Sequence, residues 1–251
     1  MFKSAFFNFI YEPLYNGLAL LVDIVPAHDI GIAVIILTIL VKVILFPLSR
    51  QAIRTQAAMR KIAPEIETLK VKFKDKQEEQ ARAIFALYKE RGIRPFSSFL
   101  LILVQFPILF GLYWVFWKGG FPNVDGSLLY SFVPFPETVN MDFLGLIDMG
   151  ERSFLLAALT GVTQYMYTRL SMGPRKPPVV EDKPTFSGDM ARSFDLQTRY
   201  VLPLIFAGIS FTLSAALPLY WATSNIFMIV QEFAMGRRFT EVNPEDKTEK
   251  T

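Results

Sequence analysis

The residue best able to act chemically in this sequence is Lys42, a cation inside the apolar run Ile30–Leu48. An ionisable side chain in such a run is costly in lipid and usually faces a polar cavity or a partner. Thr38 lies four residues earlier, so a helix would place both side chains on one face. Lys42 is then expected to attract a carboxylate of a substrate. The alternative stays open, because a lysine stem can also carry its ammonium toward the membrane surface.

Polar side chains also interrupt the other apolar runs. Any one of them could simply bond a neighbouring helix, but together they are enough to line one hydrophilic pocket. We expect no membrane carboxylate to pair with Lys42, which argues against a proton-coupled transporter. These polar residues are Gln105, Thr163, Gln164, Ser210, Thr212, Ser224 and Asn225.

Enzyme chemistry finds little support in the residue types present. The chain has no cysteine, which excludes disulfides, thiolate catalysis and sulfur-ligated metals. His28 is the only histidine and precedes the apolar run, where Asp29 is placed to cap a helix. No P-loop, H-E-x-x-H or glycine-rich nucleotide motif occurs. We therefore expect no enzyme, cofactor or metal site. Three classes of membrane protein remain: an insertase, a small-solute transporter or channel, and a passive scaffold.

The elements that would position these residues are membrane-spanning helices. A hydrophobic content of 52% and a mean hydropathy of +0.33 favour lipid over a soluble core. The fold expected is an all-α integral membrane protein with five transmembrane helices, at about 30–48, 99–117, 153–168, 200–215 and 219–235. The charge-free run Tyr200–Gln231 is divided near Pro218, because a single helix of 32 residues would be about 48 Å long, against a hydrocarbon core of roughly 30 Å.

The distribution of charge orients these spans. Of the 26 lysines and arginines, 22 fall in the loops 49–98 and 169–199 and in the C-terminal tail. The positive-inside rule makes that side cytoplasmic and places the N-terminus outside. Residues 1–27 are predicted to form an interfacial amphipathic segment, residues 28–236 the five-span core, and residues 237–251 a short cytoplasmic tail. The alternative for residues 6–25 is a first, more polar span.

The first cytoplasmic loop is predicted to form a helical hairpin at residues 50–94. Apolar residues recur at helical spacing in both arms, and Pro64 is expected to kink the first arm or to start a new helix. Twelve basic residues against six acidic ones suit contact with ribosomal RNA or targeting factors. A solvated surface that only sets the topology is an equal alternative. We expect the proline-rich and charged loop 174–189 to be mobile.

Three stretches together resemble the YidC family of membrane protein insertases, part of the wider Oxa/Alb superfamily. The first is Leu40–Leu48 (LVKVILFPL), followed by Met59 and by Ile62-Ala63-Pro64. The second contains Ala86-Leu87-Tyr88-Lys89, Pro95, Gln105-Phe106-Pro107-Ile108 and Leu112-Tyr113. The third is Leu219-Tyr220-Trp221 with Ser224-Asn225 and Gln231. The order and spacing match the family core from about residue 6 to residue 236.

The resemblance implies a hydrophilic groove that opens to the cytoplasm and to lipid but is closed outside. Such proteins accept nascent membrane proteins in a bacterial-type cell membrane, alone or beside the Sec translocon, and consume no nucleotide. Lys42 stands where the family usually has an arginine, and Trp221 where it often has a second tyrosine. No large external domain, lipidated cysteine or long basic tail is expected. The predicted groove residues are Lys42, Thr38, Gln105, Gln164, Ser210, Tyr220, Trp221 and Asn225.

Overall fold

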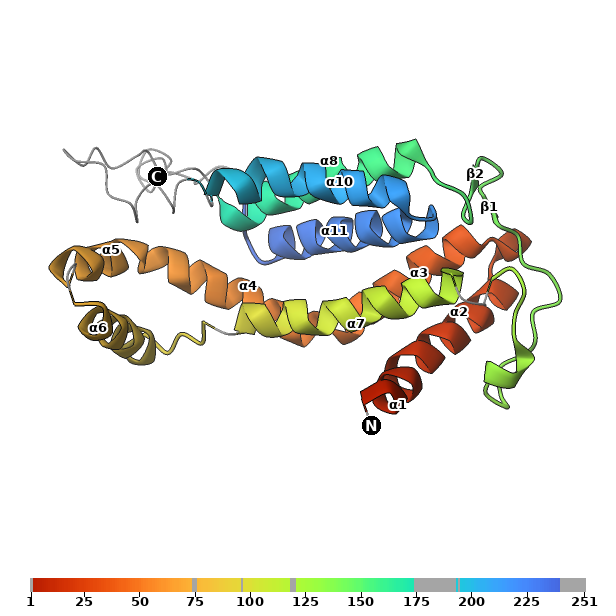
Figure 1. Ribbon diagram of the computed structural model, residues 1–251, viewed down its shortest axis with the longest axis horizontal. Coiled ribbons are helices and arrows are strands. Elements are labelled where there is room, and N and C mark those ends of the chain that lie inside the picture. The colour runs from red at the N-terminus through yellow and green to blue at the C-terminus, as the bar shows by residue number, and fades with distance from the viewer. Residues whose placement is uncertain are drawn as a thin grey trace, which may run out of the picture. The chain divides into compact units, whose positions relative to one another are not determined.

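The computed structural model is mostly helical and describes residues 2–73, 76–95, 97–117, 121–173, 193 and 195–239 (Figure 1). The chain divides into two compact units. The first unit comprises Met1–Lys42 and Leu109–Thr251, and the second unit comprises Val43–Ile108. The predicted loop 174–189 and the tail beyond residue 239 lie outside the described residues.

The first unit begins with a nearly continuous helix. It consists of α1 (Phe2–Phe6), the π-helical turn η1 (Phe7–Tyr11) and α2 (Glu12–Ile24). One face of α2 is buried, including Leu14, Leu18 and Val22, so the apolar residues of this segment pack against protein. Whether its other face lies at a membrane interface stays a prediction.

The helix α3 (Ile30–Ile44) begins at the cap that the sequence predicts. Asp29 Oδ1 accepts hydrogen bonds from the backbone N–H groups of Gly31 at 2.8 Å and Ile32 at 3.1 Å, which confirms Asp29 as the cap. The helix ends four residues before the expected boundary at residue 48, and α4 (Phe46–Lys61) follows at once. Pro47 lies in the first turn of α4, where its missing N–H costs nothing, whereas inside a longer helix it would remove a hydrogen bond.

Three helices of the first unit form a bundle in which α8 packs against both α10 and α11 (Figure 1). They are α8 (Phe154–Met172), α10 (Leu202–Thr212), which follows the π-helical turn η4 (Gln197–Val201), and α11 (Ala216–Ala234). Gly161 makes the approach of α8 to α10 close, because an added Cβ would lie 2.9 Å from Ala207 Cβ. The chain between α10 and α11 turns before Pro218, so two helices replace one long helix, as predicted.

A structured loop joins the N-terminal helices to this bundle. It contains the 3-10 turn η3 (Gly126–Leu128) and two antiparallel strands, β1 (Asp142–Phe143) and β2 (Ile147–Asp148), with Asp142 opposite Asp148. The all-α expectation missed this small hairpin, because two residues per strand leave no readable alternation of apolar and polar side chains. Backbone N–H groups of Ala215 and Ala216 donate to carbonyl groups of Glu151 and Met149, which joins the loop to the start of α11.

Long-range hydrogen bonds fasten the same loop to the helices before it. The Asn16 side chain donates to the Leu128 carbonyl at 2.9 Å and accepts from the Tyr130 N–H at 2.6 Å. Asp29 Oδ2 accepts from the Leu144 N–H at 2.8 Å. A side chain on Gly31 would overlap the Phe143 ring, so only glycine lets the strand approach α3 this closely. The loop therefore holds the N-terminal end of α3 in place.

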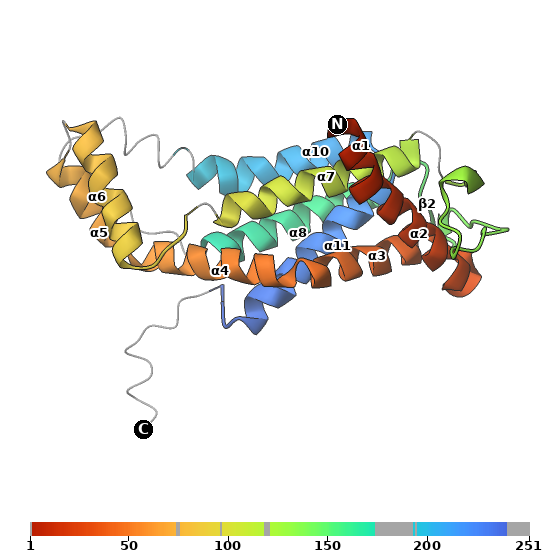
Figure 2. The ribbon, with the colours of Figure 1, turned by 90° about the horizontal axis from the view of Figure 1, so that it is seen from below.

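The second unit contains α4, α5 (Ala63–Lys72), α6 (Gln77–Glu90) and the first half of α7 (Ser97–Trp117). Pro64 lies in the first turn of α5, which confirms that it starts a new helix. Helices α5 and α6 (Figure 2) pack around Ile62, Leu87 and Ile93. The cytoplasmic location of this pair stays a prediction.

Span length can be judged only for the described residues. Among them, no single helix is both long and apolar enough to cross a membrane. Taken together, the helices Ile30–Ile44 and Phe46–Lys61 are long and apolar enough, although the chain bends between them. Leu103–Trp117 is a shorter apolar helix.

Candidate functional site

The two candidate groove residues on α3 share its buried face. The exposed fraction is 1% for Thr38 and 7% for Lys42. The Thr38 hydroxyl donates to the Val34 carbonyl at 2.6 Å, so part of its hydrogen-bonding capacity is used within its own helix. Apolar residues on other faces of α3 are exposed, such as Ile39 and Leu40. Thr38 and Lys42 are thus buried on a face that also carries apolar residues such as Leu37, while other apolar residues of α3 are exposed.

Two polar contacts join α8 to α11 at the candidate residue Asn225. The Asn225 side-chain N–H donates to Thr163 Oγ1 at 3.3 Å. The Thr160 hydroxyl is shared between the carbonyl of Leu156 at 2.9 Å and that of Pro218 at 3.0 Å. Asn225 is 7% exposed and Thr160 is fully buried. These groups thus help to hold the two helices together, whatever else they bind.

The remaining candidates on the bundle differ in what they contact. The Gln164 side chain donates to Thr168 Oγ1 at 3.3 Å and is half-buried. The Trp221 ring meets the Phe206 ring edge-on, with centroids 5.2 Å apart, and Tyr220 is 1% exposed. Ser210 is fully buried, and its hydroxyl has no hydrogen-bond partner among the described residues. The Ser224 hydroxyl, on α11, is also buried and has no hydrogen-bond partner in the described part of the chain.

The structure brings some of the predicted groove residues together but not all. Hydrogen bonds and ring contacts tie the candidates of α8, α10 and α11 into one bundle. Gln105 is half-buried on α7 and belongs to the second unit.

Sequence reasoning missed an ionic cluster at the C-terminal end of this bundle. Glu232 is fully buried on α11, and its carboxylate lies 2.9 Å from Arg237 Nε. Arg237 also donates to the Ser171 carbonyl at 2.8 Å, and Arg199 donates to the Gly173 carbonyl at 2.7 Å. The two guanidinium groups therefore cap the last carbonyls of α8, where cations stabilise a helix.

This cluster includes a carboxylate that the search for charges in the predicted spans left out. The predicted last span, 219–235, already contained Glu232, although the charge-free run was counted only to Gln231. A buried carboxylate is therefore present in α11, and Arg237 is its ion-pair partner. The signal was the spacing of Glu232 and Arg237 around Gly236, a residue with φ of 86° that ends the helix.

No group of three or more histidine or acidic side chains that could hold a metal ion occurs among the residues that the structure describes. The candidate residues of the first unit offer hydroxyl groups, amides, an aromatic pair and the Lys42 cation, which can hydrogen-bond or attract a polypeptide.

Comparison with known proteins identifies the class to which this arrangement belongs. Residues 21–242 match the 60Kd inner membrane protein family, and the chain belongs to that family. A protein of Clostridium tetani named membrane protein insertase YidC is 32% identical over 209 residues, which cover 82% of this chain and 81% of that protein.

Longer relatives carry the same name. The membrane protein insertase YidC of Methylobacillus flagellatus is 29% identical over 228 residues, which cover 91% of this chain and 36% of that protein. That of Neisseria gonorrhoeae is 27% identical over 207 residues, which cover 82% of this chain and 33% of that protein. This chain therefore spans about a third of the length of these longer relatives.

Proposed function

We propose that this chain is a membrane protein insertase. It accepts segments of nascent membrane proteins in a hydrophilic groove and releases them sideways into lipid without hydrolysing a nucleotide. Family membership and the names of its relatives support the insertase role. The observation that carries the groove is the set of buried polar side chains on the otherwise apolar helices α3, α8, α10 and α11.

The physical task of such a groove is to lower the cost of moving a polar tail through lipid. Each polar group of a client that enters hydrocarbon without a partner costs several kcal/mol, roughly 2–7 for an amide or hydroxyl. The buried hydroxyls of Ser210 and Ser224 lack partners among the described residues, so a water molecule or client group that reaches them satisfies a hydrogen bond that is otherwise missing. Asn225 and Gln164 provide amides that can exchange their present contacts for contacts with a client.

Lys42 supplies the one formal charge of the proposed groove. It is 7% exposed, so its ammonium acts in a less polar medium than water, where attraction for a carboxylate is stronger. Acidic residues in the external tail of a client would be drawn toward it and released once they reach the outer water. Gln105 and Thr38 complete the proposed set of hydrogen-bonding groups.

The setting proposed for this activity is a bacterial-type cell membrane, with the N-terminus outside and the C-terminus in the cytoplasm. The basic second unit would then meet the ribosome or a targeting factor. The Sec translocon is a further proposed partner. Support comes from the charge asymmetry of the sequence, in which 22 of 26 basic residues lie on one predicted side.

Reconstitution tests the proposed function. The purified full-length chain is placed in proteoliposomes, a small single-spanning client is synthesised outside, and the membrane-protected fragment is measured after protease treatment. An insertase raises the protected fraction and leaves the vesicles tight to small solutes. Solute flux without insertion would instead indicate a transporter or channel, and neither activity would indicate a scaffold.

A further inference from the structure

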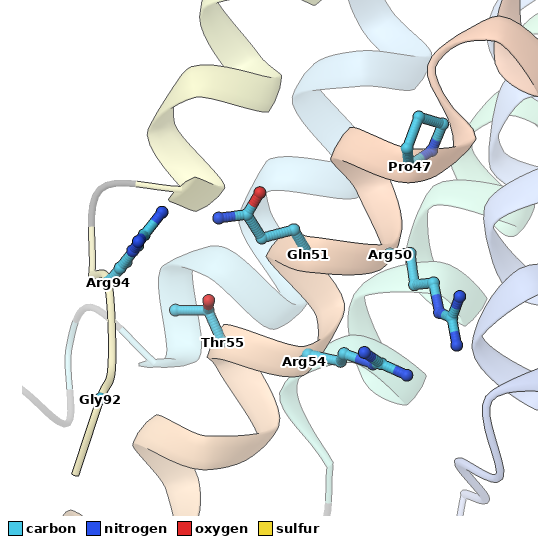
Figure 3. A pocket seen from close by; sticks show the side chains of 7 residues that line it. All are labelled: Pro47, Arg50, Gln51, Arg54, Thr55, Gly92 and Arg94. Atoms are coloured by element: carbon cyan, nitrogen blue, oxygen red, sulfur yellow. The ribbon is translucent and has the colours of Figure 1, made fainter.

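A cavity of about 420 Å³ lies in the second unit, and none of its lining residues belongs to the proposed groove. Its volume falls in the range of roughly 300–1,000 Å³ that is usual for small-molecule sites. The first turns of α4 form one wall and the segment after α6 forms the other (Figure 3). The lining residues are Pro47, Arg50, Gln51, Arg54, Thr55, Gly92 and Arg94.

The lining is strongly cationic. It contains three guanidinium groups and no carboxylate. Figure 3 shows Gln51 and Thr55 pointing toward the Gly92–Arg94 segment, while Arg50 and Arg54 extend to the other side of α4, away from Arg94. Among the described residues, neither Arg50 nor Arg54 forms an ion pair. Three like charges around one cavity repel one another, so an anion bound there would be stabilised.

The wall that carries Arg94 is fixed by the fold. Helix α6 ends in a turn where the Ile93 N–H donates to the Tyr88 carbonyl at 2.8 Å and Gly92 adopts a φ of 64°. Ile93 is 9% exposed and packs with Ile62 and Leu87. Arg94 therefore follows directly after an anchored residue, while Ala52 and Ile53 are buried on the opposite wall. Of the seven lining residues only Thr55 is buried, so the cavity is open to the surface.

Both walls continue into apolar surface that is exposed. Val43, Ile44 and Phe46 precede the α4 wall and are 55%, 74% and 38% exposed. On the other wall, Leu100 and Leu103 of α7 follow Arg94 within a few residues and are 46% and 55% exposed. A cationic cavity at the base of exposed apolar helices suits an amphiphile that has an anionic head and apolar tails.

We propose that this cavity binds the headgroup of an acidic phospholipid, with the phosphodiester held by Arg94 beside Gln51, and with Arg50 and Arg54 on α4 adding positive charge nearby. Arginine suits a phosphate because its planar group can donate two parallel hydrogen bonds. Gln51 adds an amide donor from α4. A nucleic acid is the less suitable ligand, because its phosphates extend along a backbone, whereas this site is one small cavity beside apolar side chains.

The test is a titration of the purified full-length chain in a zwitterionic detergent with short-chain phosphatidylglycerol, and binding is read from the thermal unfolding midpoint. Short-chain phosphatidylcholine and inorganic phosphate are titrated in parallel. We expect phosphatidylglycerol alone to raise the midpoint. The triple variant R50Q/R54Q/R94Q should bind it at least about tenfold more weakly, since charge-assisted hydrogen bonds are lost. R50K/R54K/R94K should fall between the two, because it keeps the charge but loses the planar fork.

A matched control separates a site from general surface charge. R82Q/K70Q/K89Q removes the same charge from the second unit but from helices α5 and α6, and should leave the affinity unchanged. Equal loss in both triple variants would overturn the proposal, as would phosphate binding as tight as that of the lipid. Binding of a ribosomal RNA fragment that depends on the three arginines, without lipid binding, would assign the cavity to RNA instead. Circular dichroism verifies that each variant keeps its helix content.

Discussion

The carboxylate of Asp29 is expected to be one of the most important side chains for the stability of the first unit. It is 3% exposed and accepts three backbone hydrogen bonds, from Gly31, Ile32 and Leu144. Removing a helix cap costs about 0.5–2 kcal/mol. Leaving the Leu144 N–H without an acceptor adds roughly 1–3 kcal/mol. Asp29→Ala should therefore lower the free energy of unfolding by about 2–4 kcal/mol.

A second substitution divides this loss between its two causes. Asp29→Asn keeps one carbonyl oxygen for the cap but turns an NH₂ group toward the Leu144 N–H, so about half of the loss should remain. Denaturant titration in detergent gives the free energies, and hydrogen exchange at the amide of Leu144 reports the local opening. Asp142→Ala, an exposed carboxylate on β1, is the control and should change stability by no more than about 0.5 kcal/mol. Unchanged stability and unchanged exchange in Asp29→Ala would refute the reasoning.

Three further predictions concern packing, topology and the second unit. Gly161→Leu should destabilise the protein by about 1–3 kcal/mol in the same denaturant titration, because α10 leaves no room for the side chain, and Gly208→Leu, which meets open space, is its control. In the cysteine-free chain, Asp75→Cys should react with an impermeant maleimide only from the cytoplasm and Phe132→Cys only from outside; external labelling at position 75 would overturn the orientation. Replacing residues 54–91 by a short linker should abolish insertion while leaving the bundle folded, and normal insertion would reduce these helices to a topology signal.

Local features of the fold could be predicted from the sequence because their causes lie within a few residues. Asp29 caps the helix that follows it, Pro64 begins a helix, and the long apolar run after Tyr200 breaks into two helices. The early end of α3 was missed, although Pro47 was visible. Pro47 has no N–H for the carbonyl of Val43, and its ring clashes with that carbonyl, which a count of apolar residues does not register.

Contacts between distant parts of the chain could not be predicted in this way. Asn16 bonds residues more than a hundred positions away, and nothing near Asn16 indicates Leu128 or Tyr130 as its partners. The candidate site shows the same division. The residue types on each helix are readable, but the contact between Thr163 and Asn225 depends on how α8 packs against α11. The Glu232–Arg237 pair was missed because the charged boundary of a span was treated as solvent-exposed.

The central claim is that buried polar groups guide a client's polar tail across the membrane, and Lys42 tests it most directly. A carboxylate about 4–6 Å from the ammonium gains roughly 1–4 kcal/mol, depending on how much water shares the groove. Insertion of an acidic-tailed client should then slow at least about fivefold in Lys42→Ala. Lys42→Arg should retain activity, and Lys42→Glu should be the slowest.

The decisive measurement is the insertion rate of two clients that differ only in tail charge, in proteoliposomes that contain either the wild type or Lys42→Ala. The proposed mechanism predicts that Lys42→Ala slows the acidic-tailed client and leaves the neutral-tailed client unaffected. Equal rates for both clients in both proteins would contradict it. Lys42 would then be a lysine whose ammonium extends to the membrane surface without binding a client.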